Sequence, residues 1–211
     1  DYLPAPSDLP PVVGHHPRSL DVETRPPADD EPFAGLVFKI MNDPYVGTLA
    51  YIRVYAGKAK LGQSVFNATK DEDERLTRIL EMHANKRREV QELYAGDIAA
   101  LGSLKNVSTG DTLCLKSRPL ILESIKFPEP VVAATIEPET KADHVRLANA
   151  LAKMAKEDPT FKVARDPNSG QTLVRGMGEL HLEIIVDRMG REYGVQARLG
   201  KPQVAYKETL R

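Results

Sequence analysis

The sequence has little of what usually identifies a function by composition alone. It contains one cysteine, Cys114, and no tryptophan among 211 residues, so no internal disulfide can form and we expect a buried, unreactive thiol. The 29 Lys and Arg against 30 Asp and Glu give a formal net charge of -1, which excludes a polycationic chain and leaves only local patches for nucleic acid. No apolar run reaches the roughly 18 residues of a membrane span, and the N-terminus does not resemble a signal peptide. We therefore expect a cytoplasmic protein without a membrane partner.

Patterns for metal binding and covalent catalysis are missing as well. The five histidines include no pair four residues apart and have no second cysteine nearby, which excludes a zinc site. The acidic run at 71–74 lacks the alternating ligands and distal glutamate of a calcium loop, so we interpret it as a solvated hairpin tip. No serine has a partnered base or an elbow motif. We expect neither a metal site nor a catalytic residue in this chain.

The stretch GKAKLGQS (57–64) comes close to a phosphate-binding loop, in which glycines free the backbone amides and a lysine reaches the terminal phosphates. Gln63 stands in the place of that lysine. The stretch also lies between two predicted strands, whereas a phosphate loop must open a helix. We therefore interpret its glycines as hairpin turns and expect no bound cofactor.

Proline and glycine divide the chain into three stretches. Residues 1–30 hold seven prolines without helical or strand periodicity, which predicts an extended linker. Residues 31–121 contain short alternating apolar runs punctuated by glycines, a pattern typical of an all-β antiparallel barrel. The first of these runs precedes a turn at Asn42, Asp43 and Pro44, and one side of it carries Ala34, Leu36, Phe38 and Ile40.

Residues 122–211 change to the order strand, helix, strand, strand, helix, strand. A strand at 131–136 precedes a helix opened by the capping pair Thr140 and Asp143. The apolar stripe expected on that helix consists of Val145, Ala148, Leu151, Ala152 and Ala155. A hairpin joins 161–166 to 172–175, and a second helix leads to a strand at 195–199. This order predicts an α+β ferredoxin-like split βαβ sandwich, with two helices on one face of an antiparallel sheet.

The stretch GMGELHLEIIVDRMGREYG (176–194) predicts that second helix in detail. Residues at three- and four-residue steps form its core face, namely Leu182, Ile185, Val186, Met189 and Tyr193. His181 is not needed for that face, and Gly176 and Gly178 would let another chain or a ligand approach the backbone. We favour a contact surface over general-base catalysis for His181, because we expect no acid close to it in the fold except Glu179.

The run NKRR (85–88) gathers cations beside a predicted strand. Lys86, Arg87 and Arg88 are candidates to hold a phosphate backbone, and Lys58 and Lys60 are similar candidates at the neighbouring hairpin. A solvated surface run is the alternative, because Glu89 and Glu92 follow closely.

Several long segments together resemble the elongation factor G family, over nearly the whole chain. They are DEPFAGLVFKIMNDPYVG (30–47), RVYAGKAKLGQSVFNATK (53–70), MHANKRREV (82–90), YAGDIAALGSLKNVSTGDTLC (94–114), KFPEPV (126–131), EDPTF (157–161) and GMGELHLEIIVDRM (176–189). The chain resembles the second and third domains of that ribosomal GTPase, and DYLPAPSDLPPV resembles the tail that leaves its GTP-binding domain.

The resemblance implies a noncatalytic central portion of a larger factor. Because the chain starts at Asp1 rather than Met, we expect an excised fragment. We also expect this fragment to be monomeric. GTP and magnesium would be bound by the family's preceding domain, so the fragment itself should not hydrolyse GTP. In the family the barrel rests on small-subunit ribosomal RNA. The third domain lies between the GTPase domain and a small-subunit protein near the decoding centre, and it relays the nucleotide state to translocation.

The same resemblance implies further site residues. The family's fusidic acid pocket, between the GTPase and third domains, corresponds here to Thr160, Gly176, Gly178, His181 and Ile185, and the hinge beside it to Pro128 and Pro130. A recycling paralogue, an organellar factor and a ribosome-protection protein are alternatives within this class. An alternative from another class is a small enzyme that holds phosphate with Arg175 on the ferredoxin-like domain.

Overall fold

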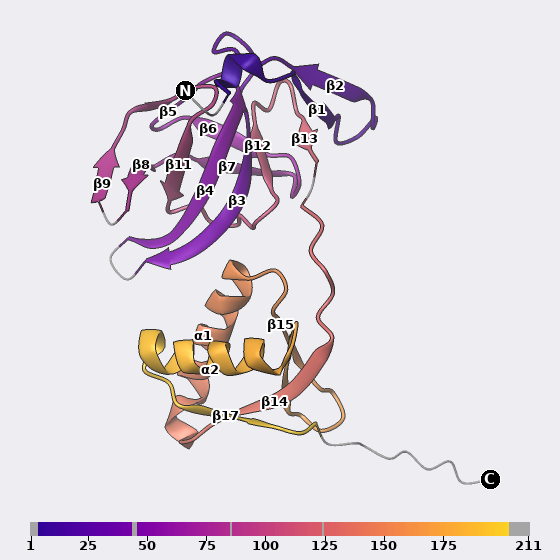
Figure 1. The fold of residues 1–211 in the computed structure, drawn as a ribbon, viewed down its shortest axis with the longest axis vertical. Helices are drawn as coiled ribbons and strands as arrows, with labels where there is room; N and C mark the ends of the chain where they lie inside the picture. The colour runs from indigo at the N-terminus through magenta and orange to yellow at the C-terminus, as the bar shows by residue number, and fades with distance from the viewer. Residues whose placement is uncertain (1–3, 44–45, 85, 124, 203–211) are drawn as a thin grey trace, which may run out of the picture. The chain divides into compact units, whose positions relative to one another are not determined.

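The computed structural model describes residues 4–43, 46–84, 86–123 and 125–202. Pro44, expected in a turn, and Asn85 of the basic run lie outside these residues. The chain divides into two compact units, the barrel unit (residues 1–126) and the sandwich unit (residues 127–211) (Figure 1). Within the described ranges, no helix is both long enough and apolar enough to cross a membrane.

The barrel unit is built on an eight-stranded antiparallel sheet with the order β7-β6-β12-β3-β4-β11-β8-β9. Its strands are β3 (Ala34–Asp43), β4 (Gly47–Ala56), β6 (Ser64–Asn67), β7 (Glu72–Arg75), β8 (Arg78–His83), β9 (Lys86–Glu89), β11 (Ile98–Gly102) and β12 (Thr112–Cys114). β5 (Ala59–Lys60) pairs separately with β10 (Glu92–Leu93). The sheet encloses apolar side chains that include Val37, Ile52, Leu76, Leu101 and Leu113. The all-β antiparallel barrel is confirmed.

Strand β3 departs from the alternation expected of it. Val37 pairs with Ile52 and Lys39 pairs with Tyr51, so Phe38 is an extra residue opposite the partner strand. Such a bulge shifts the side-chain parity by one position. As a result Val37 and Ile40 are buried, whereas Phe38 is 37% exposed, with its ring centroid 6.3 Å from that of Tyr51. The expectation that Phe38 lies on the same side of the strand as Ile40 is therefore wrong.

Residues 12–25 differ from the extended linker expected over 1–30. β1 (Val12–His15) and β2 (Val22–Arg25) form a hairpin, which extends into a three-stranded sheet by pairing with β13 (Ile121–Leu122); a 3-10 turn, η1 (Pro6–Asp8), precedes it. Arg25 is 2% exposed, and its guanidinium donates to the carbonyl oxygens of Pro32, Phe33 and Arg118 at 3.3, 3.4 and 2.6 Å. The seven prolines of residues 1–30 hid these strands, because such a composition favours an extended linker.

The sandwich unit has a four-stranded antiparallel sheet with the order β15-β16-β14-β17. Its elements are β14 (Val132–Pro138), η2 (Lys141–Asp143), α1 (His144–Glu157), β15 (Lys162–Arg165), β16 (Thr172–Gly176), α2 (Glu179–Tyr193) and β17 (Ala197–Gly200). Both helices pack on the same face of the sheet (Figure 1), and Ile136, Val174, Leu151 and Met189 are among the residues of the core between them. This arrangement confirms the predicted ferredoxin-like α+β sandwich.

The start and the buried face of α1 are not those expected. The Thr140 hydroxyl donates to Asp143 Oδ2 at 2.6 Å instead of capping a backbone amide, and a turn of 3-10 helix precedes the α-helix. Val145 is 72% exposed. The buried residues are Leu147, Ala150, Leu151 and Met154, a rotation that buries the large side chains of Leu147 and Met154 as well as Leu151.

Candidate interface sites

Helix α2 positions the residues of the candidate interface with the GTPase domain. Leu182, Ile185 and Met189 are buried on its inner face, as the spacing predicts. Gly194 ends the helix with φ 64°, a conformation that suits glycine, and its N–H donates to the Met189 carbonyl. Packing of this face against the sheet fixes the first turn of α2, and with it the position of His181.

His181 and Asp158 form a hydrogen-bonded pair that the sequence pattern did not indicate. Nε2 of His181 lies 2.9 Å from Oδ2 of Asp158, and Nδ1 accepts the Met177 N–H at 3.1 Å. Since Nδ1 accepts, a neutral ring carries its proton on Nε2 and donates it to the carboxylate. The ring also stands edge-on to Phe161, with 6.5 Å between the centroids.

Thr160 belongs to the same cluster. Oδ1 of Asp158 accepts the Thr160 backbone N–H at 2.8 Å and the Thr160 hydroxyl at 2.6 Å. Burial raises the pKa of the Asp158 carboxyl, but the hydrogen bonds from Thr160 and the nearby His181 outweigh it, so the net pKa lies below its usual range. Asp158 is therefore a carboxylate that connects the end of α1 to the start of α2.

The arrangement is suited to holding a surface in place. Both ring nitrogens of His181 are engaged, so neither is free to take a proton from a substrate. The expectation that Glu179 is the only acid near His181 is wrong, because Asp158 reaches the ring from the end of the other helix. A short acidic segment after a helix, such as EDPTF, is the signal that could have suggested such a partner.

The structure brings together some of the residues assigned to this interface, but not all of them. A Cβ on Gly176 would lie 2.8 Å from Leu182 Cδ2 and 3.0 Å from His181 Nδ1, so this glycine permits the close packing of the turn. A Cβ on Gly178 would meet open space. Ile185 is only 5% exposed and belongs to the core of the sandwich unit.

The two hinge candidates precede strand β14 directly. Pro128 is exposed and Pro130 is half-buried, and neither lies in a helix or a strand. Their role as a hinge stays a prediction.

The five candidate RNA-contacting cations of the barrel unit divide into paired and unpaired groups. Nζ of Lys60 lies 2.7 Å from a Glu92 carboxylate oxygen, and Arg87 lies 2.5 Å from Asp43. Arg88 is paired with Glu81. Lys58 and Lys86 are exposed and form no ion pair with any residue that the structure describes.

Three carboxylates of the run at 71–74 are engaged, contrary to the solvated tip expected there. Glu74 is 4% exposed and accepts the backbone N–H groups of Lys105 and Asn106 at 3.1 and 2.8 Å. Glu72 accepts from the Asn106 amide at 3.0 Å, and Asp73 is paired with Lys116. Glu72 and Glu74 of this run therefore hold the loop at Lys105 and Asn106 against strand β7.

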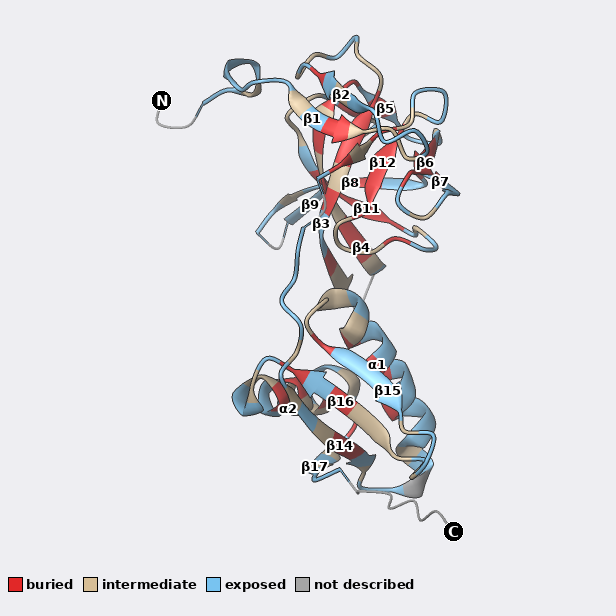
Figure 2. Ribbon diagram, turned by 90° about the vertical axis from the view of Figure 1, so that its right-hand side faces the viewer, coloured by how far each residue is buried: buried red, intermediate tan, exposed pale blue. Residues whose placement is uncertain are grey.

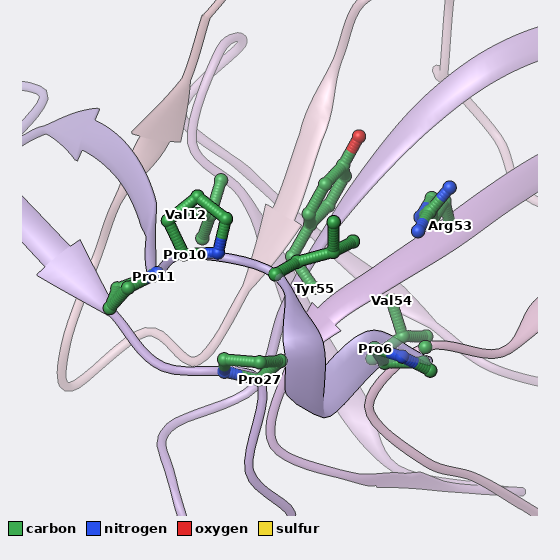
Figure 3. A pocket seen from close by; sticks show the side chains of 10 residues that line it. Pro6, Pro10, Pro11, Val12, Pro27, Arg53, Val54 and Tyr55 are labelled. Atoms are coloured by element: carbon green, nitrogen blue, oxygen red, sulfur yellow. The ribbon is translucent and has the colours of Figure 1, made fainter. Parts of the chain in front are cut away.

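A small apolar cavity of about 260 Å³ lies where the N-terminal segment meets the barrel. Prolines of that segment lie around Tyr55 and Val54 (Figure 3), and a Cβ on Gly96 would come within 2.2 Å of Pro6 Cγ. The Arg53 guanidinium lies 5.4 Å from the centre of the Tyr55 ring. The cavity is smaller than the roughly 300 Å³ at which ligand pockets begin. We therefore interpret it as a gap in the packing of the N-terminal segment against the barrel.

The structure shows the surroundings of the one cysteine and the spacing of the side chains that could bind a metal ion. Cys114 is buried, as expected, and burial raises the pKa of its thiol. In the part of the chain that the structure describes, no three His, Cys, Asp or Glu side chains gather closely enough to hold a metal ion.

Comparison with known proteins follows the division into two units. The family model for elongation factor G domain 2 matches residues 32–116, and the model for Elongation Factor G, domain III, matches residues 127–201. A crystal structure of a protein from Thermus thermophilus is similar to this chain with a TM-score of 0.72 and 31% sequence identity, over 83% of this chain and 26% of that one. The chain thus spans about a quarter of the length of that relative. Because the models of two successive domains match in order along it, the chain belongs to the elongation factor G family, of which it contains the second and third domains.

Proposed function

We propose that the chain is the noncatalytic central portion of a ribosomal translocation GTPase. The observation that carries this proposal is the match of both domains, in order, to elongation factor G. GTP and Mg²⁺ would be bound by a GTPase domain outside this chain, and the two domains would dock on the small subunit and transmit the nucleotide state. The flanking domains would separate translocation from the alternatives of recycling, organellar synthesis and ribosome protection.

In this proposal the barrel unit contacts small-subunit ribosomal RNA through its unpaired cations. Lys58 and Lys86 can each give their full charge to a phosphate. Arg87 and Arg88 already have carboxylate partners and would have to exchange them. We therefore assign the larger part of the phosphate contacts to the two lysines.

The start of α2 is proposed to face the GTPase domain. Asp158 fixes His181 and Thr160 relative to each other, and the open space at Gly178 allows another chain to come close to the backbone. A surface held by this many hydrogen bonds can transmit a displacement without first becoming ordered. The start of α2 would also supply one half of a fusidic acid pocket, the other half of which belongs to the GTPase domain. A small-subunit protein near the decoding centre would contact the sandwich unit as well.

Binding of the 211-residue chain to purified small ribosomal subunits, measured across a range of salt concentrations, tests the docking. We expect affinity to fall as salt rises, because phosphate contacts release counterions. The Lys58→Ala/Lys86→Ala variant should reduce the slope of log K against log salt by about 0.7 to 0.9 for each phosphate that is no longer neutralised. Arg88→Ala is the matched control on the same strand as Lys86 and should change the slope less. Binding that does not respond to salt would contradict the proposal.

A further inference from the structure

Among the described residues of the sandwich unit, no helix lies on one face of its sheet. Val174 and Ile136 lie in the core beneath α1 and α2, so the alternate residues of their strands point to the opposite face. On strand β16 the outward residues are Leu173, which is half-buried, and Arg175, which is exposed. Strand β15, at the edge of the sheet, is exposed along its whole length (Figure 2).

Two cations stand next to each other on this face. Lys162 of β15 and Arg175 of β16 are direct partners in the antiparallel register, and Ala133 of β14 is the partner of Arg175 on its other side. Side chains at directly opposed positions have Cβ atoms about 4.5 to 5.5 Å apart, and like charges so placed destabilise a sheet. The Lys162–Arg175 pair therefore costs stability in the isolated chain.

No carboxylate of the described residues offsets this cost. Neither Lys162 nor Arg175 forms an ion pair or a side-chain hydrogen bond with them. The same unit compensates other arginines: Arg198, on the same face, lies 3.0 Å from Glu139, and Arg188 lies 2.8 Å from Glu157. A repulsive pair left without a partner indicates an anion that comes from outside the chain.

The neighbours of the pair indicate what kind of anion. Ala133 and Ala164, the next outward residue of β15, are small and exposed, so a broad partner can come close. No aromatic side chain stands on the outward face of these strands for a base to stack on. A phosphodiester has two non-bridging oxygens that can accept from the lysine and the arginine at once, and an RNA strand repeats such groups along a surface.

We propose that the Lys162–Arg175 pair binds the phosphodiester backbone of RNA on the uncovered face of the sandwich unit. The proposal rests on the proposed function in so far as ribosomal RNA would supply that backbone. It assigns an RNA contact to the sandwich unit in addition to those of the barrel. Recognition depends on charge and on a flat surface, so it should be independent of base sequence.

The test uses the 211-residue chain and a fluorescein-labelled RNA hairpin, with affinity measured by anisotropy at several salt concentrations. Lys162→Ala/Arg175→Ala should make the slope of log K against log salt less steep by about 0.7 to 0.9 for each phosphate that is no longer neutralised. Arg198→Ala, a cation of the same face with its own partner, is the control and should leave the slope unchanged. An unchanged slope in the double variant would overturn the proposal.

Two further measurements keep the test decisive. Amide NMR spectra of the unaltered chain should show shifts at Ala133, Ala164 and Arg175 when the hairpin is added, even if the double variant does not fold. A polyglutamate peptide should not produce these shifts, and equal binding of that peptide would assign the pair to an acidic protein.

The two proposals can fail separately. If small subunits bind with salt dependence while the hairpin leaves the chemical shifts of these amides unchanged, this proposal fails and the proposed function stands. If the hairpin shifts the amides but subunits do not bind, the proposed function fails.

Discussion

Strand β9 of the barrel and the β15–β16 edge of the sandwich both expose cations, but they differ in how those charges are compensated. On β9 the register sets Arg88 opposite Glu81, and the two form an ion pair. At the sandwich edge the register sets Lys162 opposite Arg175, with no carboxylate of the described residues between them. Cross-strand register therefore decides which cations are available to a partner, whereas closeness in the sequence does not.

Breaking the ion pair between Arg87 and Asp43 should destabilise the barrel strongly. Asp43 is 8% exposed, and it accepts from Arg87 at 2.5 Å and from the Val46 N–H at 2.9 Å. Asp43→Ala should lower the free energy of unfolding by about 2 to 3 kcal/mol, because both donors lose a charged acceptor. Chemical denaturation measures this, and Asp43→Asn should recover part of the loss by keeping an oxygen for Val46. A loss below the error of the measurement would show that the Arg87 ion pair is not a stabilising one.

The Asp158 cluster gives a similar test in the sandwich unit. Asp158→Ala removes the acceptor for the Thr160 N–H, the Thr160 hydroxyl and His181 Nε2, which should cost about 1 to 3 kcal/mol. The pKa of Asp158 is depressed in the folded chain, so its contribution is complete above the unfolded pKa near roughly 4 and is lost as pH falls through the lower folded pKa. Unfolding curves at a series of pH values should therefore show the variant and the unaltered chain converging in acid. A gap that widens in acid would contradict the assignment.

The order of elements was predictable from the sequence, because long periodic segments such as 176–194 specify both a helix and its buried face. The fold of both units followed from that order and from the resemblance. The hairpin at residues 12–25 was not predictable, since its pairing with β13 and the hydrogen bond from Arg25 to the Arg118 carbonyl both join segments far apart along the chain. The bulge at Phe38 was missed for a related reason: register shifts are set by pairing with another strand.

The candidate interface was only partly visible in the sequence. His181, Thr160 and Gly176 could be named from the resemblance, but Asp158, which holds the cluster together, lies 23 residues from His181 along the chain. Ile185 could be assigned to the pocket from the resemblance, yet the helical spacing places it in the core. In the same way Lys162 and Arg175 become neighbours only through the sheet. Contacts between distant segments depend on register and helix rotation, which local patterns do not specify.

Reversing one charge of the Lys162–Arg175 pair should give the sandwich edge a cross-strand ion pair like that of Arg88 and Glu81 on β9. Lys162→Glu sets a carboxylate directly opposite Arg175, so the sandwich unit should gain roughly 0.2 to 1 kcal/mol in its free energy of unfolding. The same change should remove binding of the RNA hairpin to this face. Lys162→Gln, which removes the repulsion without adding an attraction, should give an intermediate stability. A loss of stability with Lys162→Glu would refute the repulsion between the two cations.

Removing the carboxylate that pairs with Arg88 would leave β9 with an uncompensated cation, as at the sandwich edge, and should change stability little. Glu81→Ala removes the partner of Arg88, and because the pair is exposed, with side-chain exposures of 76% and 50%, stability should change by less than about 1 kcal/mol. The freed arginine should add one phosphate contact, so the slope of log K against log salt for small subunits should steepen by about 0.7 to 0.9. Glu89→Ala is the matched control, since it frees Arg78 of the neighbouring strand instead. If both variants steepen the slope equally, the barrel attracts RNA by its net charge; if only Glu81→Ala does so, the position of Arg88 on β9 is what the ribosome contacts.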